Sequence, residues 1–473
     1  MTDNVALLDA MPVPGNPLTA GYGCVPKKMV GNEAFLAGDY EVAKILYSYA
    51  ASNDSGNYIY TLNRAQVNLN LLLWKEAEDD AVAVIEAKGV TAVHKQKARW
   101  RLYQARKGQR RVEAAREALQ DWVTAGGSQA DAEKERAELE AHENNPDVDE
   151  VTSSLENAHI SDKKDFAFSN TDEDNEFFEV KEDAHGGKGA FARKPIERGT
   201  LILAEKPLLP SPASYKEDAP LSAETILALV ERLTPAEVAR SLTLKNSRAG
   251  DPYHCFAGIW QTNAFSGAGV CATAARFNHS CVPNARYSWH AESRRQRIFA
   301  LRRIEEGEEI CVSYLMNRNI YGSSRAARRA WLEEDYRFVC MCAVCGASDE
   351  EVAKSDHRRN MLARIWRALP TMQDDPRLAV SEVASAIRIM REEGYHADAD
   401  DFASEAVNCC AAFSDWESAK YWARVMYESR RAEFGEDSRY AREAKAMMEN
   451  PGDRRRMPMA GMFKGVSFAD IRV

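Results

Sequence analysis

Residues 277–284 read FNHSCVPN, and this stretch decides the predicted fold together with GEEICVSY at residues 307–314 and YRFVCMCAVC at residues 336–345. The last stretch places Cys340, Cys342 and Cys345 in one short loop, where three thiolates can bind a metal ion. A closed structural zinc site needs four ligands, so a fourth is expected from elsewhere in the chain. The alternative is three buried, reduced thiols.

Two further stretches precede these, GGKGAFA at residues 186–192 and NAF at residues 263–265. The five stretches follow the order of the motifs in SET-type lysine methyltransferases, and residues 177–346 resemble a SET domain closed by a post-SET zinc segment. The chain also resembles SMYD-type enzymes and fungal proteins that combine tetratricopeptide repeats with a SET domain. Residues 208–261 contain only Cys255, so the cysteine-rich MYND module of SMYD enzymes is not expected.

The resemblance implies S-adenosyl-L-methionine as cofactor and Cys281 as the fourth zinc ligand. The residues that match cofactor-binding positions of the family are Gly187, Lys188, Gly189, Asn263, Asn278, His279 and Phe338. Taken alone, the glycine turn would be an ordinary hairpin turn, and Asn278 and His279 would be a turn residue and a buried histidine.

Methyl transfer to lysine needs a neutral amine that is aligned with the methyl carbon. An apolar channel beside a sulfonium lowers the pKa of the lysine through desolvation and like-charge repulsion, and alignment contributes as effective concentration. By resemblance, Tyr314 is the central tyrosine that orients the amine, while Phe265 and Tyr336 form the channel walls. An aromatic residue in a strand is ordinarily a core residue, and the motif around Tyr314 argues against that alternative.

Small residues recur before this region with a spacing of 34, from Gly31 to Ala65 and from Ala43 to Ala77. This is the period of a two-helix tetratricopeptide repeat, in which close helix crossings need small residues and larger ones such as Tyr47 fill the gaps. In a third unit, Ala115 lies 38 residues after Ala77, which is four more than the period of 34. We interpret the excess as a longer connection near Gly89. An unrelated helical bundle is the alternative.

The sequence therefore predicts an α+β protein in five segments. They are a flexible lead-in (1–25), repeat-like helices (26–128), an acidic linker (129–176), a SET and post-SET domain (177–346, with a helical insert at about 208–261) and a C-terminal repeat-like helical domain (350–473). The linker is expected to be a hinge or a partly helical, solvated spacer, and attraction of basic partners such as histone tails is the alternative.

The net charge of −10 and pI near 5.6 do not favour direct nucleic-acid binding, which needs clustered Lys and Arg. No apolar run is long enough to span a membrane, and no signal peptide is recognised. An intracellular protein of the nucleus, the cytoplasm or both is expected.

A second binding site is predicted in the repeats, where five residues resemble a clamp for chaperone tails ending in Glu-Glu-Val-Asp. They are Lys28, Asn32, Asn63, Lys97 and Arg101. Lys97 and Arg101 are four residues apart and would project from one helix face. Ordinary repeat consensus and solvated surface charge are the alternatives.

The predicted function is S-adenosylmethionine-dependent methylation of lysine in a histone or another protein. One alternative is a repeat scaffold or chaperone adaptor with weak or no catalysis. Methylation of a non-protein acceptor is another alternative, which the match to lysine-channel residues disfavours.

Overall fold

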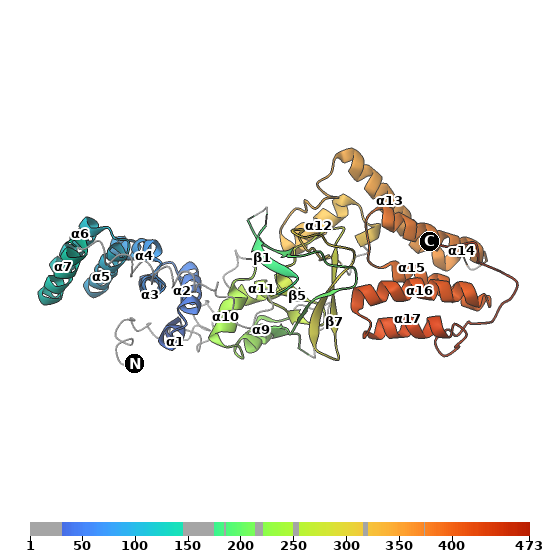
Figure 1. Ribbon diagram of the computed structural model, residues 1–473, viewed down its shortest axis with the longest axis horizontal. Helices are drawn as coiled ribbons and strands as arrows, with labels where there is room; N and C mark the ends of the chain where they lie inside the picture. The colour runs from blue at the N-terminus through green and yellow to red at the C-terminus, as the bar shows by residue number, and fades with distance from the viewer. Residues whose placement is uncertain are drawn as a thin grey trace. The chain divides into compact units, whose positions relative to one another are not determined.

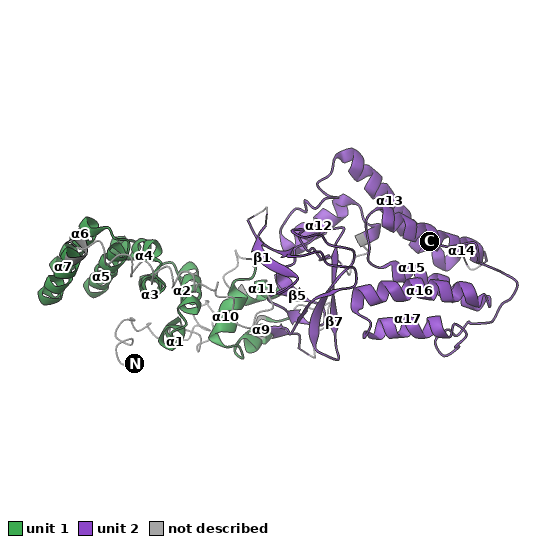
Figure 2. Cartoon of the chain, viewed as in Figure 1, with its two compact units in different colours: residues 1–170, 218–261 green, residues 171–217, 262–473 purple. Residues whose placement is uncertain are grey.

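The computed structural model describes residues 31–144, 175–183, 186–212, 221–248, 255–315, 320–372 and 374–473. The predicted lead-in and Lys28 lie outside these residues. The chain forms two compact units (Figure 2): Met1–Asn170 with Asp218–Gln261, and Thr171–Glu217 with Thr262–Val473.

The first unit begins with consecutive helices that pack each against the next (Figure 1). They are α1 (Gly31–Ala37), α2 (Tyr40–Asn53), α3 (Tyr58–Asn70), α4 (Trp74–Glu86), α5 (Ala92–Gly108), α6 (Val112–Thr124) and α7 (Gln129–Asn144). Helices α2 and α4 begin 34 residues apart (74 − 40), and so do α3 and α5 (92 − 58). The helix pairs therefore repeat with the spacing read from the sequence.

Small residues permit the close crossings in this array. A Cβ atom on Gly31 would lie 2.7 Å from the ring of Tyr47, which is itself buried. Likewise, a Cβ atom on Gly108 would overlap the indole of Trp74. The large side chains occupy the space that the glycines leave open.

The expected long connection near Gly89 is wrong. Helix α5 has 17 residues and α3 has 13, a difference of four, whereas residues 87–91 form a connection of ordinary length. The extra residues therefore lengthen α5. The small-residue spacing marks helix crossings and cannot show whether an insertion lies in a loop or at a helix end.

Helix α7 occupies the first part of the predicted linker. Its Ala132 and Leu139 are buried in the same cluster as Tyr103, and Lys107 contacts Glu135 at 2.6 Å and Glu138 at 2.8 Å. The acidic side chains thus pair with the preceding helices, and the helical region continues past the predicted boundary at 128.

The helical insert comprises α9 (Ala223–Val230), α10 (Pro235–Leu242) and α11 (Cys255–Asn263). Thr234 and Glu237 form a reciprocal capping box at the start of α10, and Pro235 occupies its first turn. Helix α10 packs against α2 within the first unit.

The described residues of the second unit form three small antiparallel sheets with strand orders β1-β2, β3-β8-β7 and β4-β6-β5. The strands are β1 (Phe178–Glu182), β2 (Lys188–Ala192), β3 (Leu201–Glu205), β4 (Leu209–Pro210), β5 (Ala264–Phe265), β6 (Gly269–Val270), β7 (Ala285–His290) and β8 (Arg295–Ala300). Their apolar faces share one core.

Residues 308–314 connect two parts of this core. The Ile310 amide donates to the carbonyl of Ala190 in β2 over 2.8 Å, and the Val312 amide donates to the carbonyl of Asn278 over 2.9 Å. Ile310 and Val312 are buried, which places the intervening residues on the opposite side. This pairing brings the 277–284, 307–314 and 186–192 stretches together.

The C-terminal helices surround a second core (Figure 1). They are α12 (Arg325–Tyr336), α13 (Asp349–Ala368), α14 (Pro376–Glu392), α15 (Ala399–Ala412), α16 (Trp416–Phe434) and α17 (Arg439–Glu449), with short 3₁₀ helices η4 (Ala274–Arg276), η5 (Ile320–Gly322) and η6 (Leu369–Thr371) in the second unit. The cysteine cluster and the largest buried side chain, Trp422, belong to this core.

Candidate active site and zinc site

The four predicted zinc ligands come together. The Sγ atoms of Cys281, Cys340, Cys342 and Cys345 all lie within 4.8 Å of one another. Cys281 lies 3.9 Å from Cys340 and 3.6 Å from Cys345. These distances fit the edge of about 3.8 Å that a sulfur tetrahedron has around zinc. The cluster therefore fits a structural zinc ion.

Close contact divides the four thiols of the cluster into two pairs, and it raises the pKa of Cys281 and of Cys340. Contact with the other thiols of the cluster lowers the pKa of Cys342 and of Cys345 below the ordinary range, with Cys281 as the largest cause. Arg328 on α12 is fully buried, and its Nη2 lies 3.7 Å from the Sγ of Cys345. With a divalent ion bound, this positive charge would offset part of the excess negative charge of four thiolates.

A side chain of helix α12 also holds the cysteine loop through hydrogen bonds to the backbone of the loop. Arg329 donates from Nε to the carbonyl of Cys340 over 3.0 Å and from Nη2 to the carbonyl of Cys345 over 2.9 Å. Arg337, in a left-handed conformation with φ 60°, ends the helix. The chain then turns so that Phe338 faces the site while the loop returns to the cluster.

His279 links the cluster to the predicted central tyrosine. Its Nδ1 accepts the backbone N–H of Tyr314 over 3.0 Å, and its Nε2 lies 3.3 Å from the Sγ of Cys281. Because Nδ1 accepts, the ring proton is on Nε2, where it points at the sulfur of Cys281. Burial lowers the pKa of His279 to about 4, so the ring is neutral. Both ring nitrogens are thus occupied by protein, which leaves the main chain of His279 to contact a cofactor.

Tyr314 lies among aromatic rings. Its hydroxyl donates to the carbonyl of Phe277 over 3.0 Å. The ring centroids of Tyr314 and Tyr336 are 4.9 Å apart, and Phe338 lies edge-on at 6.4 Å. Burial, together with the Tyr336 hydroxyl, raises the pKa of Tyr314 well above its usual range, so its phenol stays neutral. Tyr314 can orient an amine but cannot act as its base.

Phe265 belongs to the core shared with Tyr314. It is 9% exposed, and its ring lies 4.9 Å from that of Tyr287 on β7 at an angle of 75°. Tyr287 is therefore a further aromatic residue beside the predicted channel, and the sequence analysis missed it. The alternation of residues 285, 287 and 289 in β7 was the signal that could have found it.

Asn278 is held by acidic groups that the motifs did not reveal. Its Nδ2 donates to Glu309 over 2.7 Å, to Asp183 over 3.0 Å and to the carbonyl of Lys188 over 3.3 Å. Two carboxylates in this position can accept hydrogen bonds from an ammonium group such as that of an amino acid.

Gly189 sits where no side chain fits. A Cβ atom there would lie 2.5 Å from Oε1 of Glu309 and 3.0 Å from Nδ2 of Asn278. Gly187 precedes it, and its N–H donates to Asp183 over 2.9 Å. The glycines thus let the backbone approach the Asn278 pocket, as the cofactor-binding prediction requires.

Asn263 ends α11, two residues before Phe265. The NAF stretch thus spans the end of α11 and strand β5. A residue that the sequence analysis missed supports this region: the buried Glu205 accepts the N–H groups of Thr273 at 3.0 Å and Ala274 at 2.8 Å. That carboxylate fixes η4 immediately before the 277–284 stretch.

The predicted peptide clamp is only partly brought together. Asn63 is fully buried, and its Nδ2 donates to Asn32 over 3.4 Å. Arg101 is 3% exposed and donates to Gln66 over 3.2 Å and to the carbonyl of Leu62. Lys97 lies one turn earlier on α5. Arg101 thus already serves helix packing.

Comparison with known proteins identifies the domain family of the central region. The SET domain family matches residues 187–315 of this chain. The chain therefore contains a SET domain, as predicted from its motifs, and these residues include the glycine turn, the 277–284 stretch and Tyr314.

Three proteins similar to this chain are named as lysine methyltransferases. Histone-lysine N-methyltransferase set5 of Schizosaccharomyces pombe is 29% identical over 283 residues, which cover 58% of this chain and 85% of that protein. Protein-lysine N-trimethyltransferase SMYD5 of Homo sapiens is 41% identical over 87 residues, 18% of this chain and 20% of that protein. Histone-lysine N-methyltransferase ATXR2 of Arabidopsis thaliana is 40% identical over 70 residues, 14% of each protein.

The SET domain and these relatives support protein-lysine methyltransferase function, and SET methyltransferases use S-adenosylmethionine. Among the described helices, none is both long and apolar enough to cross a lipid bilayer.

Proposed function

We propose that this protein transfers methyl groups to lysine side chains of a histone or another protein. The observation that carries the proposal is the convergence of the rings of Tyr314, Tyr336 and Phe338 with that of His279. His279 and Tyr314 lie within the matched SET region, and the other two rings come from the segment after it. S-adenosylmethionine supplies an activated methyl group on a cationic sulfur.

The residues of the site provide a dry, oriented environment for an amine. Tyr314 is neutral and hydrogen-bonded at its hydroxyl, so it presents a fixed dipole to the amine. The rings of Tyr336 and Phe265 are proposed to form walls that exclude water and tolerate a cation as it enters. Exclusion of water lowers the pKa of an entering lysine, which favours the neutral form that can react.

The cofactor pocket is proposed to use Asn278, Glu309 and Gly189 around the amino-acid end of the donor, with Gly187 and Lys188 in the adjoining turn. The acidic pair Asp183 and Glu309 supports this placement because it can accept an ammonium group. Phe338 is proposed to cover the adenine, and Asn263 to contact the donor from the end of α11.

The test is transfer of radiolabelled methyl from S-adenosylmethionine to histones and to cell-extract proteins, with the labelled residue identified by mass spectrometry. Calorimetric titration with S-adenosylmethionine separates the proposal from the scaffold alternative. Saturable donor binding with label on lysine supports the enzyme. Donor binding below detection and no labelled protein would favour the scaffold.

The finer architecture is also part of the proposal. We infer that the N-terminal helices are tetratricopeptide-like, because helix pairs repeat at 34 residues and small residues lie at their crossings. We infer that no MYND module is present, because residues 208–261 carry a single cysteine. The C-terminal helices are proposed to form a second repeat-like domain beside the peptide groove.

Binding of a chaperone tail by the N-terminal helices remains a proposal. The hydrogen bond between Asn63 and Asn32 supports a preformed polar cluster, while the burial of Arg101 weighs against a role in contacting a peptide. Titration with a peptide ending in Glu-Glu-Val-Asp tests it. Binding that is lost on Lys97→Ala supports the clamp, and undiminished binding contradicts it.

We also propose that the protein acts inside the cell, in the nucleus, the cytoplasm or both. Four thiols gathered for zinc, which a reducing compartment preserves, support this. Imaging of a fluorescent fusion would test the location.

A further inference from the structure

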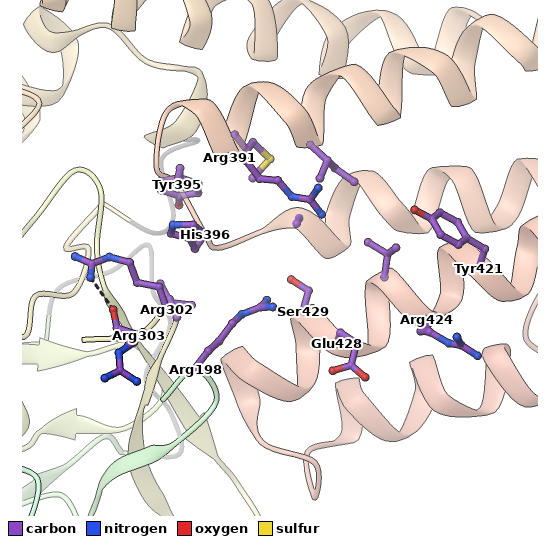
Figure 3. Close-up of a pocket in the computed structure, with 15 residues that line it drawn as sticks. Arg198, Arg302, Arg303, Arg391, Tyr395, His396, Tyr421, Arg424, Glu428 and Ser429 are labelled. Carbon is purple, nitrogen blue, oxygen red and sulfur yellow. Dashed lines mark hydrogen bonds between the residues drawn. The ribbon is translucent and has the colours of Figure 1, made fainter. Parts of the chain in front are cut away.

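A cavity of about 500 Å³ lies within the second unit, away from the predicted methyl-transfer residues. Its walls come from the turn before β3, the segment after β8, the end of α14 and one face of α16 (Figure 3). None of the catalytic, cofactor-binding or zinc-binding residues predicted above lines it. The cavity is therefore a separate candidate site.

Five arginines line this cavity although the chain as a whole carries a net charge of −10. Arg302 is paired with Glu308 at 2.5 Å, and Arg303 is paired with Glu197 and Glu305. For Arg198, Arg391 and Arg424, the described residues offer no ion pair. Glu428 is the one acidic residue in the lining, and it pairs with Arg431 at 2.7 Å.

Two of the unpaired arginines, Arg198 and Arg391, lie toward one end of the cavity, whereas Arg424 lies apart from them on α16 (Figure 3). Figure 3 shows Arg391 and Arg198 reaching toward the space between the helices and the SET-domain segment from opposite sides. His396 lies beside them. Burial lowers the pKa of His396, and the guanidinium groups of Arg198, Arg302 and Arg391 lower it further. Positive potential is thus concentrated where an anion would enter.

The cavity is elongated, with cationic groups at more than one point. Tyr421, Arg424, Val425, Glu428 and Ser429 share one face of α16. The nine residues from 421 to 429 are separated by eight helical rises and span about 12 Å of helix. An extended chain of about four residues covers that length, whereas one small anion does not.

The floor of the cavity is apolar. Leu301, Ile387 and Met390 contribute buried side chains, and Val425 adds to them. A ligand that fills the site should therefore carry an apolar group between its anionic groups. A peptide in which acidic and apolar side chains alternate meets both conditions, because it presents them on opposite sides of an extended backbone.

We propose that this cavity binds an extended acidic segment of a partner protein, with anionic side chains at Arg198, Arg391 and Arg424 and an apolar side chain on the floor. The anionic groups can be carboxylates or phosphoryl groups, since arginine recognises both. The claim concerns binding alone and does not depend on the methyltransferase function proposed above.

The test is fluorescence anisotropy of the full chain with three labelled octapeptides, in which Glu, phosphoserine or Lys alternates with Leu. We expect the Glu or the phosphoserine peptide to bind and the Lys peptide not to bind, with affinity that falls as salt rises. The tighter of the first two identifies the source of the anionic groups.

Alanine substitutions of single arginines test whether the peptide binds in this cavity. Arg198→Ala and Arg391→Ala should each weaken binding about tenfold, because each removes a charge-assisted hydrogen bond. Arg388→Ala is the matched control, since Arg388 is an exposed arginine one turn earlier on α14 that does not line the cavity. Circular dichroism melting of every variant checks that the fold is intact.

Three outcomes would overturn the proposal. They are equal binding of the Lys peptide, an equal loss of binding on Arg388→Ala, and displacement of the peptide by inorganic phosphate at the same concentration as unlabelled peptide. Binding of a single-stranded oligonucleotide through the same arginines, with neither acidic peptide bound, would also contradict a peptide partner.

Discussion

The hydroxyl of Tyr314 donates to the backbone carbonyl of Phe277 over 3.0 Å, and the backbone N–H of Tyr314 donates to His279 over 3.0 Å. Tyr314 is therefore attached at two points to the segment that also supplies Asn278 and Cys281. The proposed amine-orienting group, the proposed donor pocket and the zinc cluster share one short stretch of chain. A substitution that displaces one of these three groups should therefore displace the other two.

Zinc content is the first prediction. We expect one zinc ion per chain, and Cys281→Ser should lower the bound zinc and the melting temperature because a closed site loses one of its four ligands. Methyl transfer should fall as well, since Cys281 holds His279 and His279 holds Tyr314. Elemental analysis, melting curves and methyl-transfer rates measure these effects.

The control for zinc is Cys410→Ser, at a cysteine that is equally buried but outside the cluster. It should keep full zinc content. Protein purified without chelator that contains no zinc, or equal zinc in the Cys281→Ser variant, would show that the four thiols are a reduced structural cluster.

Donor affinity should depend on Gly189. In the Gly189→Ala variant the new methyl group would lie against the carboxylate of Glu309 and the amide of Asn278, so both must move. We expect the Kd for S-adenosylmethionine to rise at least about tenfold, the equivalent of about 1.4 kcal/mol, with little loss of stability. Isothermal titration calorimetry measures it.

Gly452→Ala provides the comparison, because the nearest atom to its added methyl group lies 3.6 Å away. The affinity of the Gly452→Ala variant for S-adenosylmethionine should equal that of the unmodified protein. If Gly189→Ala also bound the donor normally, the glycine turn would be an ordinary hairpin turn.

Stability should fall with rising pH because of Glu433. This side chain is fully buried, lies 2.9 Å from Arg286 and accepts a hydrogen bond from Ser429; Asp398 and Asp400 also face it. Burial raises its pKa from 4.5 to about 8, despite the opposing effect of Arg286. The folded state therefore retains a proton that the unfolded state loses, and its contribution to stability is full below pH 4.5 and lost as pH rises through about 8.

Urea unfolding of the Glu433→Gln variant isolates this effect. Its amide does not titrate; the amide oxygen can accept from Arg286, and the amide NH2 group can donate to the hydroxyl of Ser429. We expect the unmodified protein to lose up to about 1.4 kcal/mol per pH unit relative to the variant between pH 5 and 8. Parallel pH profiles for the two proteins would mean that Glu433 is ionised throughout.

The motifs predicted the four-cysteine cluster, because a tetrahedral metal site admits few ligand types and spacings. The roles of Tyr314 and of the 277–284 stretch in methyl transfer stay predictions. The repeat spacing was readable for a similar reason, since a close helix crossing tolerates only small residues such as Gly31.

Other parts could not be read from the sequence. Arg328 and Arg359 are buried arginines on helices whose residue pattern resembles that of a solvated surface, and only the fold shows that they contact Cys345 and Cys281. Arg101 is the reverse case, since a motif match suggested a peptide contact and packing placed it in the interior. The partner of a long charged side chain depends on tertiary structure.

The most direct test of the account is methyl transfer by the Tyr314→Phe variant, measured together with its affinity for S-adenosylmethionine. Tyr321→Phe, which alters a buried tyrosine outside the site, controls for the loss of a hydroxyl. We predict that Tyr314→Phe lowers the methyl-transfer rate at least about a hundredfold while the donor Kd changes less than about threefold, because the hydroxyl orients the amine and leaves donor binding to other groups. Turnover equal to that of the unmodified protein would contradict the assignment of Tyr314 and the channel built around it.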